Sequence, residues 1–337
     1  MRNHGRQRAA KDTRPYRRDA QPKRKLAWAV ILNRPVIAIF SLLLLLAGCR
    51  TLPPPAAVRT GEEIIVAGQY FPTGTRVVTW HEPGGYNAYQ PVLAPDGSVR
   101  PKNHGLRRLD PAGPEPAEPP DLAGLRGLVD QFVLHYDTLG LSGRCFDILQ
   151  NRGLSVHFLL DVDGTVYQTL DLQERAWHAT IANNRSIGIE IANLGAYPVG
   201  EKNPFAVWYV PDEAGGVRLS PPLEKNRIRT PDFVGRPARA EPVTGTVQGK
   251  ELVQYDFTPE QYAALIKLTA ALHRVLPKIR LDYPCDADGA LLLETMTEEQ
   301  WVEFGGVIGH FHIQDNKVDP GPALQWDKVI EGARSLQ

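Results

Sequence analysis

Short stretches of alternating apolar and polar residues in the middle of the chain predict β-strands. In residues 131–136 the side chains alternate between two faces, and His135 shares its face with Val133. In residues 186–193 three isoleucines occupy one face, while Glu190 lies on the other face with two small residues. Side chains two residues apart in a strand leave on the same side. Both strands therefore pair an apolar face with a face that presents a titratable side chain.

Apolar runs and turn residues predict the neighbouring elements. Residues 156–161 and 165–169 flank Asp163-Gly164, a two-residue signature of a β-hairpin. Shorter apolar patterns predict a helix over residues 145–150 and a last helix over residues 324–330. Strands and helices therefore alternate along this part of the chain.

The strongest helix signal begins at Thr258. Threonine is a preferred N-cap, and Pro259 suits the first helical position. Apolar residues then recur at helical spacing from Tyr262 to Leu272. Together these patterns predict an α/β fold, with a mixed central β-sheet flanked by helices and an extended N-terminal arm.

The remaining segments have the composition of attachments to this domain. Residues 198–250 are rich in proline, glycine and charge, and we expect them, like residues 283–297, to form surface insertions. Residues 49–121 combine a proline-rich tether with strand-like patches such as residues 63–67. They contain too few apolar residues for a core of their own. We therefore expect an arm that packs on a catalytic domain formed by residues 122–337.

The first 48 residues have the pattern of a signal peptide. After a basic stretch, the apolar run Val36–Ala47 has 12 residues, whereas a membrane-spanning helix needs roughly 20. The run ends in Leu46-Ala47-Gly48-Cys49, which resembles the lipobox of bacterial lipoproteins. We expect cleavage before Cys49, lipidation of Cys49, and a protein of the cell envelope anchored on the periplasmic side of a bacterial membrane. The alternative is an uncleaved anchor that ends in a cysteine by chance.

Charge and cysteine usage narrow the functional classes. Residues 1–48 contain 11 basic and two acidic residues, whereas the rest of the chain contains 27 basic and 36 acidic ones. A mildly acidic body argues against nucleic acid as a partner. Cys145 and Cys285 can pair in an oxidising compartment or remain free thiols, and neither lies in a closely spaced ligand cluster.

The segment 310–322 concentrates residues that carry chemistry. Lys317 and Asp319 are two apart, and the proline after Asp319 favours an extended chain, so their side chains leave on one side. With His310 nearby, this pattern predicts half of a zinc site and a cationic helper. Catalytic zinc usually has three protein ligands. His135, at the end of its apolar strand, is the candidate for the remaining one.

Four stretches, taken in order, resemble the zinc-dependent N-acetylmuramoyl-L-alanine amidase family, which also includes phage amidases and animal peptidoglycan-recognition proteins. They are Val133-Leu134-His135-Tyr136, residues 155–168 (SVHFLLDVDGTVYQ), residues 176–190 with Ala176-Trp177-His178-Ala179, and residues 310–322. The similarity runs from about Val133 to Trp326 and is broken by the two insertions. It implies the family's fold, Zn²⁺ as cofactor, and hydrolysis of the amide bond between N-acetylmuramoyl residues and L-alanine of peptidoglycan.

The resemblance also implies roles for individual residues. His135, His310 and Asp319 match the zinc ligands of the family, Glu190 matches its catalytic base, and Lys317 matches the lysine that stabilises the transition state. Some members of the family lack the glutamate and instead use a tyrosine at the position of Val156. The present chain therefore favours the glutamate mechanism.

Several of these assignments have alternatives. Glu190 can be a solvated strand carboxylate, and Lys317 can form a salt bridge to Asp315 or Asp319. The loop after His310 is one residue shorter than in familiar bacterial members, which makes His312 a rival ligand.

Two further residues are candidates for contacts with the substrate. His178 follows a tryptophan and can contact the substrate, support the metal, or be a satisfied core imidazole. Asn184, on the loop before the Glu190 strand, is expected to bind the stem peptide of peptidoglycan or a muropeptide.

Two other functional classes compete with the amidase. A lipid-anchored module that binds peptidoglycan without cleaving it would lack one of the ligands or the base, and all are present. A zinc endopeptidase is disfavoured because the sequence contains no His-Glu-x-x-His motif. The leading hypothesis is a zinc amidase with peptidoglycan or muropeptides as its partner and a lipid attachment to the membrane.

Overall fold

The computed structural model describes residues 59–337 except residues 95, 111–112, 115 and 223–227. The described residues belong to one compact unit. The expected signal peptide, the lipobox with Cys49 and the proline-rich tether lie outside the described residues. Among the described helices, none combines the length and the apolar character needed to cross a membrane.

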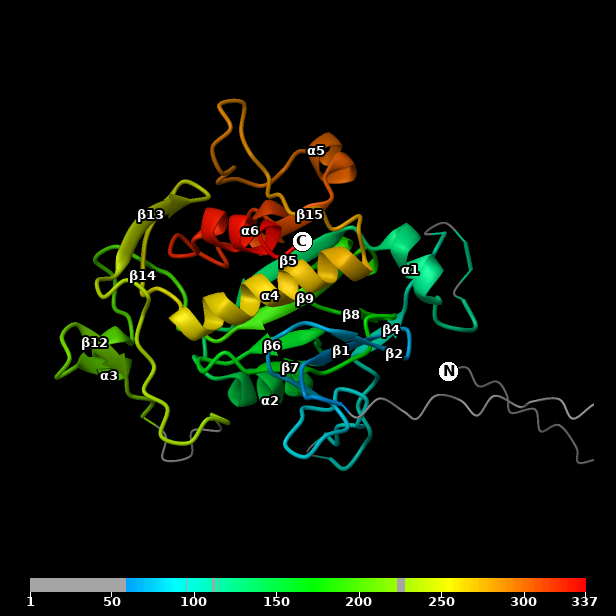
Figure 1. Ribbon diagram of the computed structural model, residues 1–337, viewed down its shortest axis with the longest axis horizontal. Coiled ribbons are helices and arrows are strands. Elements are labelled where there is room, and N and C mark those ends of the chain that lie inside the picture. Colours follow the sequence, from blue (N-terminus) through cyan, green and yellow to red (C-terminus); the bar gives the residue numbers. More distant parts are fainter. Residues whose placement is uncertain (1–58, 95, 111–112, 115, 223–227) are drawn as a thin grey trace, which may run out of the picture. The chain divides into compact units, whose positions relative to one another are not determined.

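A six-stranded mixed sheet forms the centre of the molecule (Figure 1). Its strands, in spatial order, are β15 (Gly306–Gly309), β5 (Gln131–Tyr136), β9 (Ser186–Ile191), β6 (Phe158–Leu160), β7 (Val166–Gln168) and β3 (Val77–Thr79). The first four strands are parallel to one another, β7 is antiparallel to β6, and β3 is parallel to β7. The mixed α/β sheet predicted from the sequence is therefore confirmed, including the β6–β7 hairpin around Asp163-Gly164.

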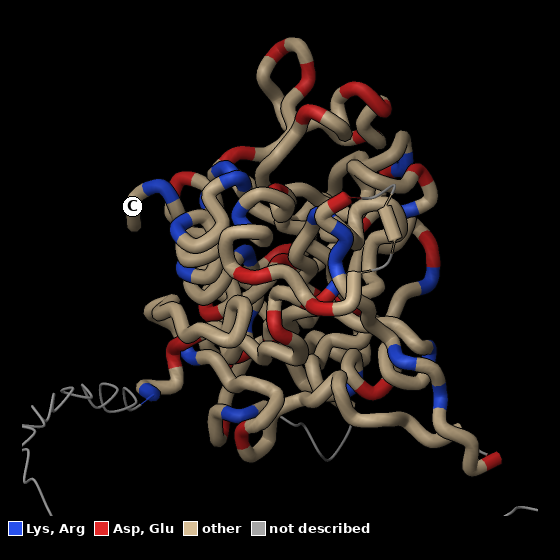
Figure 2. Tube along the Cα trace, turned by 90° about the vertical axis from the view of Figure 1, so that its right-hand side faces the viewer, with Lys and Arg blue, Asp and Glu red and all other residues tan. Residues whose placement is uncertain are grey.

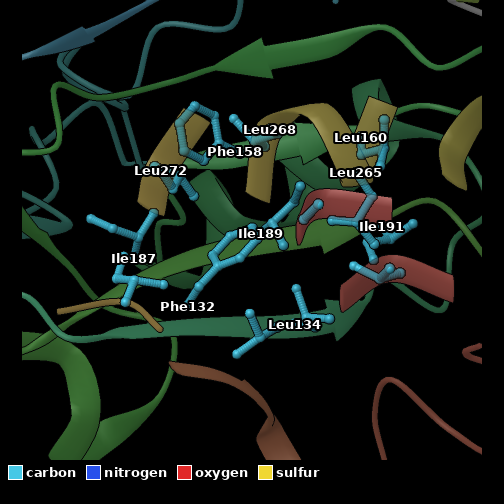
Figure 3. Packing of buried hydrophobic residues seen from close by; sticks show 14 of the residues in the cluster. Phe132, Leu134, Phe158, Leu160, Ile187, Ile189, Ile191, Leu265, Leu268 and Leu272 are labelled. Carbon is cyan, nitrogen blue, oxygen red and sulfur yellow. The ribbon is translucent and has the colours of Figure 1, made fainter. Parts of the chain in front are cut away.

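One face of this sheet packs against the long helix α4 (Pro259–Val275). Figure 3 shows the isoleucines of β9 beside Phe132 and Leu134 of β5, with Leu265, Leu268 and Leu272 of α4 packed against the sheet. The predicted cap is present, since the Thr258 hydroxyl accepts from the Gln261 N–H and the Gln261 side chain accepts from the Thr258 N–H. Burial of this shared apolar surface fixes which residues of each strand face the core.

The opposite face of the sheet is covered by helix α2 (Ser142–Arg152). Leu159 of β6 packs there against Cys145 and Leu149. The helix is longer than the expected 145–150, and it ends at Gly153 in the left-handed conformation. Because α4 and α2 cover opposite faces, a side chain that alternates away from α4 is directed towards α2.

The remaining helices frame this core. Helix α6 packs on α4 and spans Trp326–Arg334, later than the predicted 324–330. Two short helices, α1 (Leu122–Leu128) and α5 (Glu298–Glu303), are capped at their N-termini by the side chains of Asp121 and Thr297. The boundaries differ from the sequence estimates because helix ends depend on capping and packing as well as on periodicity.

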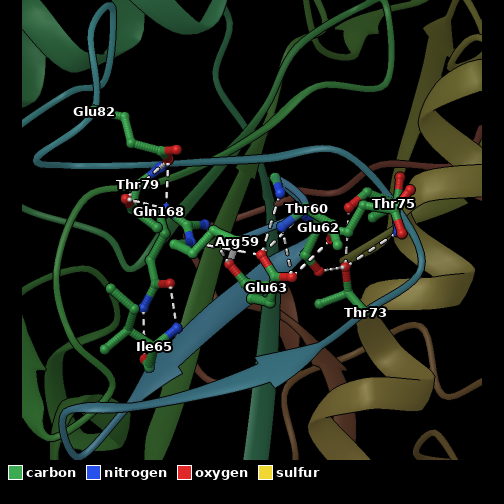
Figure 4. Close-up of polar contacts among 11 residues, drawn as sticks. Arg59, Thr60, Glu62, Glu63, Ile65, Thr73, Thr75, Thr79, Glu82 and Gln168 are labelled. Carbon is green, nitrogen blue, oxygen red and sulfur yellow. Dashed lines mark hydrogen bonds and ion pairs between the residues drawn. The ribbon is translucent and has the colours of Figure 1, made fainter. Parts of the chain in front are cut away.

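The N-terminal arm supplies one strand of the central sheet, β3, and two further pairs. These are the hairpin of β1 (Glu63–Val66) with β2 (Gln69–Pro72), and β4 (His104–Leu106) paired with β8 (Glu174–Ala176). Figure 4 shows how polar groups hold this region: the Gln168 amide accepts from the Ile65 N–H and donates to the Ile65 carbonyl. Arg59 also forms an ion pair with Glu82 at 2.9 Å. The arm is thus built into the same compact unit as the domain.

The described residues of the insertion at 198–250 form several short strands and one helix. Its elements are β10 (Tyr197–Pro198), α3 (Phe205–Trp208), β11 (Tyr209–Pro211), β12 (Val217–Leu219) and β13 (Val243–Val247), and β13 forms a hairpin with β14 (Lys250–Gln254). Phe205, Trp208 and Tyr209 pack in a small apolar cluster with domain residues such as Leu141 and Leu194. The second insertion, residues 283–297, contains one β-bridge between Cys285 and Leu291.

Charged residues are distributed over many segments of the described chain. Figure 2 shows acidic and basic positions interspersed along the tube. The two cysteines in the described part are both free thiols, with Cys145 buried and Cys285 exposed. This settles the alternative that the sequence left open.

Candidate active site

Strand topology brings three of the predicted functional residues to one edge of the sheet. Because β15, β5 and β9 are parallel neighbours, their carboxyl ends meet. In register, His135 lies opposite Glu190, and in a parallel sheet such partners point to the same side. His310 follows β15 directly and opens a single 3₁₀ turn, His310–His312. The side of the sheet that carries these residues is the one away from α4.

The side chains of His135, His310 and Asp319 converge on one point. Asp319 Oδ2 lies 2.9 Å from His135 Nδ1 and 3.0 Å from His310 Nδ1, and the two nitrogens are 3.0 Å apart. All three residues are buried. In a tetrahedral zinc site with metal–nitrogen bonds of 2.0–2.1 Å, ligand atoms are about 3.3 Å apart. The observed spacing is close to that value.

The other ring nitrogens explain why this group suits a cation. His310 Nε2 lies 2.8 Å from Gln314 Oε1, an acceptor, so the ring proton belongs on Nε2 and the Nδ1 lone pair is free. His135 Nε2 lies 3.0 Å from His178 Nδ1, and His178 Nε2 lies 3.3 Å from Ser186 Oγ. A consistent assignment has His135 donate to His178 and His178 donate to Ser186. Two lone pairs and a carboxylate then face one another, which is a donor set suited to Zn²⁺.

Burial shapes the ionisation of this group. Desolvation, followed by the neighbouring His310, lowers the pKa of His135 to about 4. Burial by itself would raise the pKa of Asp319, but the two neighbouring imidazole rings of His135 and His310 outweigh it and lower that pKa well below its ordinary value. These shifts favour a neutral His135 imidazole beside an ionised Asp319 carboxylate. These are the protonation states that bind a metal ion.

Glu190 lies beside the His-His-Asp group and is partly exposed. Burial, and then the charges of Asp319 and Asp137, raise the pKa of Glu190 well above its ordinary value. Its place in the lining of a cavity, beside the candidate metal ligands, favours a role in the site over that of a solvated strand carboxylate. A carboxylate with a raised pKa in a cavity is a candidate proton carrier.

Lys317 also lines this cavity. Within the described part of the chain, its ammonium forms neither the ion pair with Asp315 nor the one with Asp319 that was considered from the sequence. A cation held at a cavity without a carboxylate partner is available to an incoming group.

The cavity has a volume of about 230 Å³. Helix α2 and the segment after it supply an apolar wall, opposite the polar side chains that come from the sheet edge and from the His310 loop. Its lining residues are His135, Tyr136, Asp137, Thr138, Leu139, Cys145, Ile148, Leu149, Arg152, Leu154, Trp177, His178, Glu190, His310, Lys317 and Asp319. A pocket with apolar walls and a few convergent polar groups is the usual form of a small-molecule site.

Two predicted substrate-binding residues have different positions. His178 lines the cavity, but its ring bonds to His135 and Ser186, so its observed contacts support a candidate metal ligand. Asn184 does not line this cavity. Its amide donates to the Arg108 carbonyl and accepts from the Arg108 N–H, which ties the N-terminal arm to the loop. The structure thus shows a structural contact for Asn184, and the expected contact with the stem peptide stays a prediction.

His312, the rival ligand, is occupied elsewhere. Its Nδ1 accepts from the Gly309 N–H, and its Nε2 lies 2.8 Å from the Leu292 carbonyl. The ring is fully buried and lies outside the His-His-Asp group. This excludes the alternative in which His312 takes the place of His310.

Sequence reasoning missed Arg107 and Gln314. Arg107 is fully buried and donates to the carbonyls of Leu172, Asn183, Asn184 and Ser186, and it lies 2.9 Å from His157 Nε2. It therefore anchors the start of the Glu190 strand from the arm. Nothing in the pattern around residue 107 distinguishes it from surface arginines. Gln314, four residues after His310, was identifiable by its spacing alone.

The fold and this cavity define a class of protein: a mixed α/β domain with a site able to hold a metal ion beside a carboxylate. Residues 126–322, more than half of the chain, match the family model described as N-acetylmuramoyl-L-alanine amidase. The chain therefore belongs to the N-acetylmuramoyl-L-alanine amidase family. A comparison with curated protein sequences gave no match.

Solved structures of amidases are also similar to this chain. A selenomethionine derivative of AmpD is 16% identical, with 74% of this chain and 97% of that chain covered and a TM-score of 0.32. AmiD from E. coli, in complex with anhydro-N-acetylmuramic acid-L-Ala-D-gamma-Glu-L-Lys, is 17% identical, with 72% and 65% covered and a TM-score of 0.35. The endolysin LysCS from Clostridium intestinale is 14% identical, with 62% and 86% covered and a TM-score of 0.33.

Proposed function

We propose that this protein is a zinc-dependent amidase that hydrolyses the bond between the lactyl group of N-acetylmuramic acid and L-alanine in peptidoglycan. The observation that carries the proposal is the His-His-Asp group with Glu190 opposite His135 on the neighbouring strand. Family membership supports the reaction class, and the donor set supports the metal.

His135, His310 and Asp319 would hold the zinc ion. When bound, zinc polarises the scissile carbonyl and lowers the pKa of water to about 7. The residues of the chain supply the remaining functions, and each can be assigned from its place in the cavity.

Glu190 is the proton carrier. Its carboxylate accepts the proton of the attacking water and then delivers it to the leaving nitrogen of L-alanine. A raised pKa suits both steps, because the protonated form must be a competent acid once the proton has been accepted.

Lys317 is the stabiliser of the developing negative charge. Its ammonium, which lines the cavity and forms no ion pair with Asp315 or Asp319, donates to the carbonyl oxygen as that oxygen becomes anionic. The apolar wall from α2 limits water around this interaction and so strengthens it.

We further propose that Cys49 carries lipid and that the enzyme works from the periplasmic side of a bacterial membrane. This rests on the apolar run and the lipobox-like Leu46-Ala47-Gly48-Cys49. Several acyl chains anchor a protein stably, because each buried methylene contributes about 0.8 kcal/mol.

The direct test is digestion of purified cell wall by the full-length protein in detergent, with mass spectrometry of the products. We expect free stem peptides that begin with L-alanine, loss of this release on chelation, and its return with zinc. Glu190→Gln is the matched inactive control because it keeps the size of the side chain. Binding to the wall without release of peptides by the zinc-loaded protein would instead support the non-catalytic binding module.

A further inference from the structure

Both insertions form hydrogen bonds with the loop that carries His310. The hairpin formed by β13 and β14 reaches it from residues 198–250, with Gln248 and Gly249 as its two-residue turn. Both turn residues have positive φ, 53° and 67°. Such values are favoured in the tight turns that join twisted strands, but they are uncommon for a residue other than glycine. A glutamine is therefore held at a position where glycine, asparagine or aspartate is usual.

The hydrogen bonds of the Gln248 side chain explain why a glutamine occupies this turn position. Its Nε2 donates to the Phe311 carbonyl and to Thr295 Oγ1, both at 2.7 Å, and lies 3.4 Å from the Gln314 carbonyl. Its backbone N–H donates to the Leu293 carbonyl at 2.9 Å. One side chain thus connects the tip of the first insertion, the second insertion and the loop after His310.

The second insertion makes parallel contacts with the same loop. Thr295 Oγ1 donates to the Phe311 carbonyl at 3.1 Å, and the Met296 N–H donates to the His312 carbonyl at 3.0 Å. These carbonyls belong to a short 3₁₀ turn that cannot satisfy them internally. The insertions therefore supply the donors that keep this turn in one conformation.

Gln314 connects this turn to the imidazole ring of His310. It follows the 3₁₀ turn closely, and its N–H donates to the His310 carbonyl at 3.2 Å. Its Oε1 accepts from His310 Nε2 at 2.8 Å. This bond fixes the ring orientation and leaves Nδ1, the atom that faces Asp319, without a proton. A methionine at this position would fill the same space but accept no such bond.

We propose that Gln314 and Gln248 form a two-glutamine clamp that positions His310 for metal binding. Gln314 orients the ring directly, and Gln248 holds the loop on which both His310 and Gln314 stand. The proposal gives the two insertions a role in building the site, and it rests on the proposed function only in taking zinc as the metal.

The experiment measures zinc affinity by competition with a chelator, using the full chain in detergent and zinc alone as the probe. Gln314→Met is expected to weaken zinc binding by about 10-fold or more, the range found for partners of metal ligands. Gln314→Glu, which keeps an acceptor, is expected to stay within about 3-fold of the unaltered protein. Gln248→Met is expected to weaken binding by a smaller factor, because it acts through the loop.

Gln325→Met is the matched control, since Gln325 donates to Asp256 at 2.9 Å and contacts none of these residues. It is expected to lower the melting temperature without a change in zinc affinity. Zinc affinities of Gln314→Met and Gln248→Met equal to that of Gln325→Met would overturn the clamp. A rise in the zinc dissociation rate in both variants, with Gln314→Glu retaining zinc, supports it.

The zinc-affinity experiment tests the clamp separately from the proposed amidase activity. If the unaltered protein binds zinc and Gln314→Met binds it more weakly, the clamp stands even where no peptide is released from wall. If the unaltered protein is active and the variants bind zinc normally, the proposed function stands and the clamp fails. In active protein, the clamp further predicts a fall in kcat at saturating substrate with KM within about 2-fold, measured at equal zinc loading.

Discussion

Glu190 stands opposite His135 on adjacent parallel strands, and both side chains leave the sheet on the face away from helix α4. Neighbouring strands are about 4.8 Å apart, so this pairing sets the carboxylate beside the candidate metal ligands without any contribution from a flexible loop. Rigid elements hold catalytic groups more accurately than loops do.

Replacement of Glu190 by glutamine tests its role as proton carrier. Because a positioned acid–base group contributes about 10²–10⁴-fold, we expect kcat to fall by that factor. Zinc content measured by atomic absorption should be unchanged, since Glu190 is outside the His-His-Asp group. Full activity in the glutamine variant would exclude Glu190 as the base.

Replacement of Lys317 by methionine tests stabilisation of the transition state. The loss of one donor to a developing oxyanion costs about 10²–10³ in rate, and we expect this loss in kcat with little change in KM. A steady-state assay on a defined muropeptide separates the two constants. A change confined to KM would show that Lys317 only binds the substrate.

Removal of zinc should destabilise the folded protein. A ligand present at 100 times its dissociation constant contributes about 2.7 kcal/mol, which for a chain of this size corresponds to a melting temperature shift of roughly 4–5 °C. Calorimetry with and without chelator measures this shift. Asp319→Ala, which removes one ligand, should show a much smaller effect of the chelator.

Asp161 predicts a dependence of stability on pH. Its side chain is fully buried, its Oδ1 accepts from the Val162 N–H, and its Oδ2 has no partner among the described residues. Burial raises the pKa of Asp161 to about 7, from an ordinary value of 3.8. The unfolded chain therefore loses this proton at lower pH than the folded protein does. The contribution of Asp161 to the free energy of unfolding is therefore largest below about pH 4, and it falls as the pH rises to 7.

Asp161→Asn removes this titration. We expect the variant to gain stability relative to the unaltered protein between pH 5 and pH 8, by up to a few kcal/mol. Urea unfolding at several pH values gives the difference. An identical pH profile for the two proteins would show that Asp161 is ionised at no cost in the fold.

Cys49→Ala tests the lipid anchor. If the lipobox-like sequence is processed, the variant should move from the membrane fraction to the soluble fraction when cells are broken. Immunoblotting of the two fractions measures the distribution, and Cys285→Ala, at an exposed cysteine, is the matched control. Unchanged fractionation of Cys49→Ala would contradict lipidation at this residue.

Local patterns in the sequence were sufficient to predict the strands and helices that bury one apolar face. The strand at residues 131–136, the hairpin around Asp163-Gly164 and the cap at Thr258 all appear as predicted, because each depends on the spacing of apolar residues or on a single local hydrogen bond. The last helix begins later than expected, since its start depends on packing against α4.

Contacts between segments that are distant in the sequence could not be predicted from those local patterns. The two polar atoms of the Asn184 amide are taken by the backbone of Arg108, 76 residues away, and the His312 ring is taken by Leu292, so neither was recognisable as structural. The same holds for Gln248, which reaches Phe311 across 63 residues.

The sequence by itself determined the residue types of the candidate metal site and the strands that carry two of the site residues, because motif spacing and periodicity are local properties. Only the tertiary structure decided that His135, His310 and Asp319 meet within 3.0 Å, that Glu190 stands beside them, and that the arm and the insertions hold the surrounding loops. The reason is that strand order and the pairing of buried polar groups depend on which distant segments satisfy one another, and spacing along the chain does not contain that information.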